Sequence, residues 1–418
     1  MSQLLFYIII GVVVADFIFQ RILAYLNSTR WSDTLPVEVK GIYDEEKYRH
    51  QQAYQKVNYR FSSISSTYSF VIMLLMFLLA GFAWVNNIAL SVSANSILTA
   101  LVFFGILMFA SDILSTPFSV YDTFVIEEKF GFNKTTPKTF VLDKIKGWLI
   151  GAILGGGLLA LIIFIYQLTG KNFWIYAWGV NTAFSIFMVL FYSSLIVPLF
   201  NKQTPLPDGE LKRAIESFAS KVGFKLDNIY VIDGSKRSTK ANAYFTGLGP
   251  KKRIVLYDTL IQNFTINELV AVLAHEIGHY KKNHVVWSLL LGILQTGITL
   301  FIFSRFIGNP NLSNALGVAE PSFHIGLIAF GILYSPISII TGLAMNIYSR
   351  KNEYEADAFA AHHFDGNELA SALKKLSVRN LSNLRPHPLY VFFHYSHPTL
   401  LQRLKALGEV QRPLQGPL

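Results

Sequence analysis

The 418-residue sequence contains no cysteine. This absence excludes a disulfide framework, a thiol nucleophile and thiolate metal ligands, so a metal would have to be held by His, Asp or Glu. Charge is also scarce, because only 15% of the residues are charged, against about a quarter in soluble domains. By contrast, 52% are hydrophobic. This composition indicates a protein that lies in a lipid bilayer.

Long stretches almost free of charge recur along the chain, dominated by Leu, Ile, Phe, Val and Ala. A helix needs about 20 residues to cross about 30 Å of hydrocarbon, and seven stretches are long enough. The first contains Asp16 and Arg21 and lacks a preceding basic region, so we expect a retained helix and not a cleaved signal peptide. The predicted spans are residues 4–26, 64–85, 97–120, 148–168, 174–199, 285–307 and 323–348.

Basic residues are unevenly distributed among the segments that connect these spans. Residues 27–63 and 121–147 are rich in Lys and Arg, whereas the segments after the second, fourth and sixth spans carry few or none. Basic residues accumulate on the cytoplasmic side, so we expect the N-terminus outside and the odd-numbered loops and C-terminal region in the cytoplasm. Anionic membrane lipids are a sufficient partner for the net charge of +10, and we predict no nucleic-acid binding.

The polar segment between the fifth and sixth spans has the features of a small folded domain. A helix is predicted near 210–222, with short strands near 228–232, 241–246 and 253–257. The sequence from Thr265 to Glu268 then fits a capping box at the start of another helix.

His275, Glu276 and His279 form an HExxH pattern on this last helix. The spacing places both imidazoles on one helical face, where they can bind Zn²⁺ while the glutamate faces the attacking water. The alternative is a pair of surface histidines with satisfied hydrogen bonds, which the small and apolar residues around 271–278 disfavour. We expect His284 to lie off the zinc face, in an interfacial or supporting role.

A catalytic zinc site needs a third protein ligand, and Glu353 is the best candidate. Two spans separate it from His279, so the chain returns to the same membrane face. Asp357 follows one helical turn later and could accept the free ring N–H of a ligand histidine, whereas Glu355 is expected to point elsewhere. The alternative is that Arg350, Glu353 and Asp357 form a solvated helix end.

At this point the sequence resembles a known family, the type I CAAX prenyl proteases, which are membrane zinc endopeptidases of the gluzincin group. The resemblance is carried by residues 275–284 and 349–360, by 242–247 upstream of the zinc helix, and by 395–404 with its His-Pro and Arg. It covers nearly the whole chain, including the number of spans and the order of the motifs.

The resemblance implies a role for each matching residue. One Zn²⁺ per chain would be held by His275, His279 and Glu353, with Asp357 supporting a ligand histidine. Glu276 would be the general base, and the cleft for the substrate would be lined by Asn242, His397 and Arg403, with His397 as a donor to the oxyanion.

The expected fold is an all-α membrane protein with seven transmembrane helices around a chamber and a small cytoplasmic α+β metalloprotease domain. The chamber is implied only by the resemblance. Four parts are expected. Residues 1–200 hold transmembrane helices 1–5 and cytoplasmic loops, 201–284 form the α+β domain ending in the HExxH helix, 285–364 hold helices 6–7 with the third ligand, and 365–418 form a helical cytoplasmic segment.

The expected function is zinc-dependent removal of the C-terminal tripeptide from prenylated CaaX proteins or peptides. The site would lie on the cytoplasmic side of a bacterial inner membrane or of the endoplasmic reticulum. The main alternative is a broad-specificity metalloprotease for quality control of membrane proteins. A transporter, a channel or a zinc-dependent peptide-binding scaffold is also considered, but the capped HExxH helix and Glu276 disfavour these.

Overall fold

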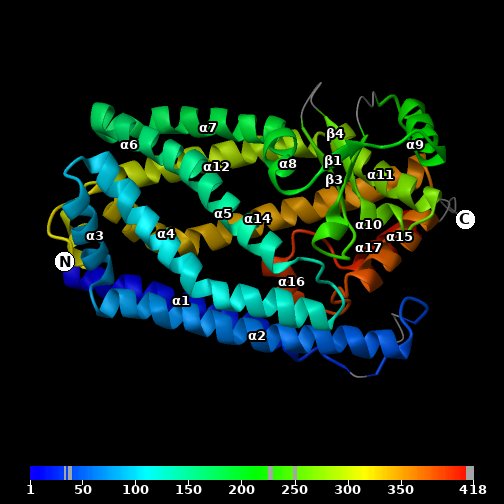
Figure 1. Ribbon diagram of the computed structural model, residues 1–418, viewed down its shortest axis with the longest axis horizontal. Coiled ribbons are helices and arrows are strands. Elements are labelled where there is room, and N and C mark those ends of the chain that lie inside the picture. The colour runs from blue at the N-terminus through cyan, green and yellow to red at the C-terminus, as the bar shows by residue number, and fades with distance from the viewer. Residues whose placement is uncertain (33, 36–39, 225–228, 248–251, 411–418) are drawn as a thin grey trace, which may run out of the picture.

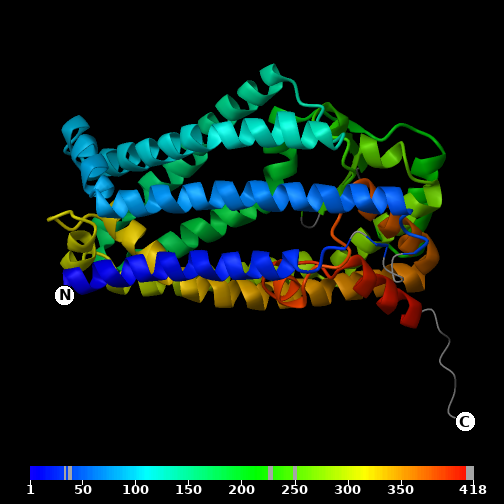
Figure 2. The same ribbon diagram turned by 90° about the horizontal axis from the view of Figure 1, so that it is seen from below.

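The computed structural model describes residues 1–32, 34–35, 40–224, 229–247 and 252–410. Long helices lie side by side along the longest axis, and a small sheet with several shorter helices gathers at one end (Figure 1). Viewed from below, α1 (Ser2–Ser28), α2 (Glu45–Leu78) and α14 (Phe323–His363) run nearly parallel (Figure 2). The expected helical membrane fold with a small α+β part is confirmed.

Within the described residues, six helical segments are long and apolar enough to cross a membrane. One of them, Pro137–Leu199, turns back at Gly170–Asn172, where Gly170 has a φ of +54°. It therefore contains two of the seven predicted spans, in helices that pack against each other. The segments are Ser2–Ser28, Glu45–Leu78, Ser96–Glu127, Pro137–Leu199, His284–Phe306 and Phe323–His363.

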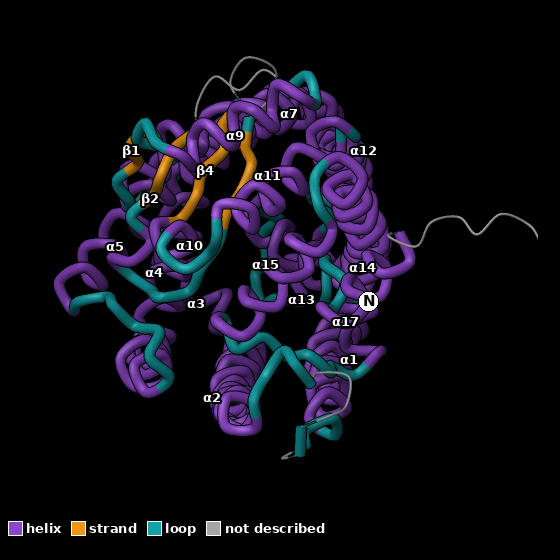
Figure 3. Tube along the Cα trace, turned by 90° about the vertical axis from the view of Figure 1, so that its right-hand side faces the viewer, coloured by secondary structure: helices purple, strands orange, loops and turns teal. Residues whose placement is uncertain are grey.

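Large apolar side chains cover the outside of these helices. Ile18, Leu114 and Ile340, for example, are at least 40% exposed, which suits contact with lipid and not with water. In the end-on view of the tube trace, the long helices form a ring (Figure 3). The helices of the membrane part are α1, α2, α3 (Gly81–Val92), α4 (Ser96–Tyr121), α5 (Pro137–Ile150), α6 (Gly157–Thr169), α7 (Phe173–Phe191), α8 (Val197–Phe200), α12 (His284–Phe306), α13 (Pro310–Ala315) and α14.

The sheet has four strands in the order β1-β2-β4-β3. The three predicted strands are confirmed as β2 (Ile229–Ile232), β3 (Ala243–Thr246) and β4 (Arg253–Tyr257), and β2 runs parallel to β4 while β3 is antiparallel to it. A fourth strand, β1 (Gln203–Pro205), is not among the predicted strands and pairs antiparallel with β2. Among the described strands β3 is an edge strand, so one side of its backbone has no strand beside it.

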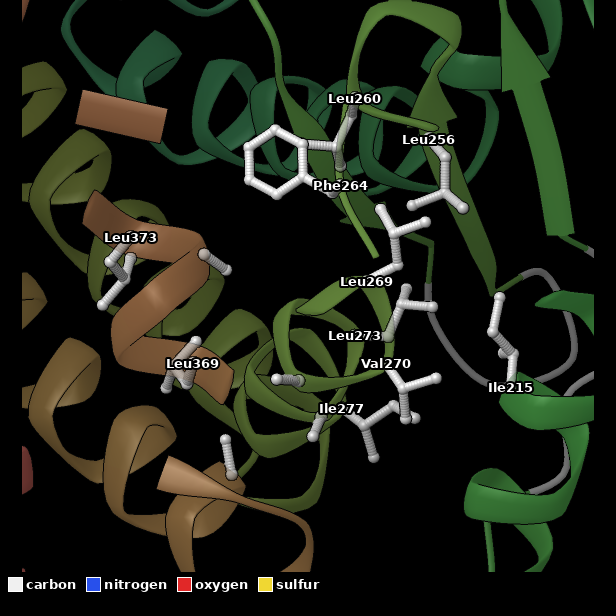
Figure 4. Close-up of a cluster of buried hydrophobic side chains, with 14 of the residues drawn as sticks. Ile215, Leu256, Leu260, Phe264, Leu269, Val270, Leu273, Ile277, Leu369 and Leu373 are labelled. Carbon is white, nitrogen blue, oxygen red and sulfur yellow. The ribbon is translucent and has the colours of Figure 1, made fainter. Parts of the chain in front are cut away.

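Besides α11 (Ile266–Lys281), which packs against α9, α14 and α15, five shorter α-helices complete the described part of the chain. They are α9 (Glu210–Lys221), α10 (Asp258–Ile261), α15 (Gly366–Arg379), α16 (Pro388–His394) and α17 (Leu400–Val410). Leu269, Leu273 and Ile277 of α11 are buried and meet side chains from the sheet, from α9 and from α15 (Figure 4). Because apolar contacts surround α11, its position is fixed by packing on several sides.

Two ion pairs join this domain to the membrane helices. Arg237 holds Asp143 of α5 through two hydrogen bonds of 2.8 and 2.9 Å. Lys240 lies 2.7 Å from a carboxylate oxygen of Glu127, which follows α4. Both basic residues belong to the segment that leads into β3, so the contacts fix where this edge strand stands relative to the bilayer.

Candidate metal centre

The helix that carries the HExxH pattern begins as predicted. The Thr265 side chain accepts a hydrogen bond from the Glu268 N–H, and the Glu268 carboxylate accepts one from the Thr265 N–H. Ser371 and Lys375 of α15 also donate to this carboxylate. These bonds hold the pKa of Glu268 below its usual value although burial alone would raise it. The helix start is therefore tied to α15.

α11 and α14 cross in close contact at Gly278. The missing side chain leaves room for the backbone of Ala356 and for Phe359 on α14. A close approach of two helices needs a small residue at the crossing point. Because Gly278 is flanked by His275 and His279, the contact brings both histidines to the face of α14 that bears Glu353.

The ligand atoms of His275, His279 and Glu353 all lie within 4.8 Å of one another. The two Nε2 atoms are 3.1 Å apart, His275 Nε2 lies 3.4 Å from Glu353 Oε2, and His279 Nε2 lies 3.3 Å from Glu353 Oε1. Metal–ligand bonds of about 2.0–2.1 Å in a tetrahedron place neighbouring ligand atoms about 3.3 Å apart. The three predicted ligands therefore fit a tetrahedral metal ion.

The electrostatics of the cluster also favour a cation. His275 Nδ1 lies 2.8 Å from Asp357 Oδ1, so the carboxylate accepts a hydrogen bond from Nδ1–H and favours the tautomer whose Nε2 lone pair faces the cluster. Burial alone would lower the pKa of His275, yet the neighbouring carboxylates of Asp357 and Glu353 raise it to about 9. Within the part of the chain that the structure describes, the buried Glu353 Oε2 accepts no hydrogen bond. The cluster thus attracts positive charge and offers unshared lone pairs to bind it.

Glu276 lies on α11 between the two histidines and is partly buried. Burial raises the pKa of its carboxyl, the positive charge of the histidines opposes this, and Glu353 adds to it. No described side chain donates a hydrogen bond to this carboxylate, so it is available to a water molecule beside the cluster.

Arg403 of α17 lies next to Glu353 and forms two hydrogen bonds to the Asp357 carboxylate. Its Nε and one terminal nitrogen donate to the two carboxylate oxygens at 2.8 and 2.6 Å, and the other terminal nitrogen lies 3.6 Å from Glu353 Oε2. The guanidinium is only 12% exposed. This arrangement overturns the alternative that Glu353 and Asp357 form a solvated helix end, because both carboxylates are buried.

His397 lies at the mouth of the cluster, in the loop between α16 and α17. Its Nε2 is 3.3 Å from Glu353 Oε1, and its side chain is 61% exposed. Arg350 was the third residue of the solvated helix end considered as the alternative. It donates to the backbone oxygens of Val391, Phe392 and Tyr395. It thereby fixes the end of α16 and the start of the His397 loop.

Asn242 immediately precedes the edge strand and is exposed. Its backbone oxygen accepts a hydrogen bond from Tyr257, and β3 packs against α11. The residue therefore lies at the start of the strand beside the HExxH helix, and its contact with a substrate stays a prediction.

Glu355 lies outside the ligand cluster, as expected, but it is linked to that cluster through His284. Glu355 Oε2 lies 3.2 Å from His284 Nε2, and His284 Nδ1 lies 3.0 Å from His279 Nδ1. His284 is off the ligand cluster as expected, but it contacts a ligand directly. The turn between α11 and α12 produces this contact, and the HExxH spacing carries no signal for it.

The chain is similar to known proteins along most of its length. Residues 24–202 match the family model described as CAAX prenyl protease N-terminal, five membrane helices, and residues 205–411 match the model of peptidase family M48. "CAAX prenyl protease 1" of Saccharomyces cerevisiae is 36% identical over 96% of this chain and 95% of its own length. A homologue from Oryza sativa is 39% identical over 90% of both chains. The crystal structure of S. mikatae Ste24p superposes with a TM-score of 0.90 at 37% identity, over 96% of this chain and 98% of that one.

Proposed function

The chain belongs to peptidase family M48 and to its CAAX prenyl protease branch, and from this membership we propose that it is a zinc-dependent endopeptidase that removes the C-terminal tripeptide from prenylated CaaX proteins. The observation that carries the proposal is the convergence of His275, His279 and Glu353 on one point, with Glu276 beside them. The substrate class is supported by relatives of that name that align along most of their length.

The proposed site residues act as follows. When bound, zinc is a Lewis acid that polarises the scissile carbonyl and acidifies the attacking water. Glu276 takes the proton from this water and passes it to the leaving amine, a task that suits a carboxyl whose pKa is raised by burial. His397 lies within reach of the same point and donates to the oxygen on which negative charge develops. Asp357 holds His275 in the tautomer that binds the metal.

The substrate is proposed to bind as an extended strand along β3. An edge strand offers backbone N–H and C=O groups to such a peptide, and β3 lies against the helix that carries Glu276. Asn242 at the start of β3 and Arg403 behind Glu353 border this path. Prenylated chain ends arrive at the membrane surface, which suits a site close to the end of the apolar part of α14.

The proposed orientation in the membrane rests on the distribution of basic residues among the loops. We place the basic loops, the domain of residues 201–284 and the C-terminal segment 365–418 in the cytoplasm. Residues 411–418 of that segment lie outside the described part of the chain. The helices of 1–200 and 285–364 hold these parts at the membrane. Anionic lipids at that face are the partners of the basic loops. We place the chain in the endoplasmic reticulum or a bacterial inner membrane.

The test is cleavage of matched peptides by the purified protein in detergent. A farnesylated CaaX peptide and its unmodified counterpart are compared, with a chelator, with zinc added back, and with the Glu276→Gln variant. Release of the tripeptide from the farnesylated peptide only, lost with chelator and in Glu276→Gln, is the expected result. Equal cleavage of the unmodified or of unrelated peptides would instead support a broad quality-control protease. Bound zinc without cleavage of any peptide would contradict the enzymatic proposal.

A further inference from the structure

We propose that His284 and Glu355 form a hydrogen-bond relay that orients the metal ligand His279 through its Nδ1 atom, so that its Nε2 atom faces the metal site. This inference rests on the proposed metal site and adds two positioning residues to it. Neither residue offers a ligand atom to the cluster. His284 contacts His279, and Glu355 acts through His284.

The relay is continuous in the structure. Glu355 Oε2 lies 3.2 Å from His284 Nε2, and His284 Nδ1 lies 3.0 Å from His279 Nδ1. His284 is only 5% exposed. It also lines a cavity of about 420 Å³, whose other walls include Val189, Val285 and Leu289. Ser288, Ser349 and Asn352 also line this cavity. A hydrogen bond to a ring as buried as that of His284 is stronger than the same bond in water.

The chemistry of the three groups fixes the direction of the relay. A carboxylate only accepts hydrogen bonds, so His284 Nε2 carries the proton that Glu355 receives. A neutral His284 then presents Nδ1 as an acceptor, and His279 must donate from its own Nδ1. The lone pair of His279 is thereby left on Nε2, which is the atom that faces His275 and Glu353.

The chain reaches this arrangement through a break between two helices. A residue five positions after His279 on a continuous helix would lie about 140° around the axis, at 100° per residue. Instead α11 ends at Lys281, and Asn283 adopts a left-handed conformation with a φ of +57° before α12 begins. Asn is one of the few residues that tolerate this conformation. The reversal returns the ring of His284 to His279.

A single helix thus supports both ligand histidines. Asp357 accepts a hydrogen bond from His275 Nδ1 directly. His279 Nδ1 donates instead to His284, and His284 donates to Glu355. Glu353 supplies the third ligand atom from the same helix. Its Oε2 lies 3.4 Å from His275 Nε2, and its Oε1 lies 3.3 Å from His279 Nε2. Partners of this kind behind a ligand histidine are typically worth 10–100-fold in metal affinity.

The test measures zinc affinity by competition with a chromophoric chelator, together with zinc content and thermal unfolding. In His284→Leu the acceptor is lost, and zinc should bind about 10–100-fold more weakly. In His284→Asn the amide oxygen occupies the place of Nδ1, so binding should stay close to that of the native protein. His362→Leu, an exposed histidine on α14, is the matched control and should leave zinc affinity unchanged.

The outcomes separate the relay from the proposed function. If the native protein takes up no zinc, the proposed metal site fails. If it takes up one zinc ion and His284→Leu binds as tightly as His362→Leu, only the relay is wrong. A folded His284→Asn protein that binds zinc as weakly as His284→Leu would also overturn the relay, because the acceptor would then not be what His279 needs.

Discussion

Gly278 of α11 faces Ala356 of α14 so closely that a Cβ atom on Gly278 would lie 3.1 Å from the Ala356 Cα atom. It would meet the Phe359 Cβ atom at the same distance. These neighbours are backbone atoms of Ala356 and the Cβ atom of Phe359, so a change of side-chain rotamer cannot move them away. The contact sets the separation of the two helices that carry the proposed ligands.

Gly278→Ala should therefore force α11 and α14 apart. Overpacking of this kind costs about 1–3 kcal/mol, and a shift of a few tenths of an ångström would spread the ligand atoms. We expect a lower unfolding temperature and a loss of zinc affinity, measured on the same purified sample. Gly408→Ala is the control, because that helical glycine has open space around its Cβ position. Equal behaviour of the two variants would contradict the packing argument.

Arg403→Met should destabilise the protein as well as the site. Asp357 is buried, and removing the partner of a buried charge costs about 3–5 kcal/mol. We expect a clear fall in the unfolding temperature, measured beside Lys405→Met, an exposed position on the same helix. If Arg403→Met only raised the KM for the peptide and left unfolding unchanged, contact with substrate would be its main role.

Glu268 should contribute stability that depends on pH. Its folded pKa lies below the ordinary value of 4.5, so its stabilising effect is complete above that value and is lost as the pH falls below it. Unfolding followed between about pH 6 and pH 3 should show a steeper loss for the native protein than for Glu268→Gln. Glu216→Gln, at an exposed position of α9, should follow the native curve. Parallel curves for all three proteins would rule out the predicted linkage.

The Arg237–Asp143 pair should couple the domain to the membrane helices. Both side chains are less than a quarter exposed and form two hydrogen bonds. A double-mutant cycle with Arg237→Gln and Asp143→Asn should give a coupling energy of about 0.5–3 kcal/mol. Hydrogen exchange in residues 234–242 should rise in either single variant. The exposed pair Lys212–Asp208 serves as the comparison, with an expected coupling below about 0.5 kcal/mol.

Sequence reasoning found the parts of this protein that have local signals. The capping box at Thr265 is seen as predicted, and the predicted span 323–348 lies within the helix Phe323–His363. Glu353 was chosen because two crossings return the chain to the same face, and the structure brings it to His275 and His279. Each of these inferences rests on periodicity, spacing or topology, which a single sequence contains.

The missed features depend on three-dimensional context. Gln203–Pro205 has the composition of a turn, yet it forms a strand because β2 offers it an edge and proline is tolerated there. The contact between His284 and His279 needs the left-handed residue Asn283, and few sequence signals predict such a residue. The direction of Glu355 was predicted from its angle on the helix alone. Its contact with His284 depends on the position of α12, which that angle does not contain.

The long helix α14 joins the bilayer to the catalytic centre without interruption. It contains Pro336, a residue type at which helices bend, and Glu353 lies 17 residues further on, about 25 Å away at about 1.5 Å per residue. Each degree of bending at Pro336 would therefore displace Glu353 by about 0.4 Å. Helices respond to bilayer thickness by tilting or kinking, and at this length a small bend would be amplified at Glu353. The contact between Gly278 and Ala356 is therefore also the point that holds Glu353 beside the two histidines when the lipid around α14 changes.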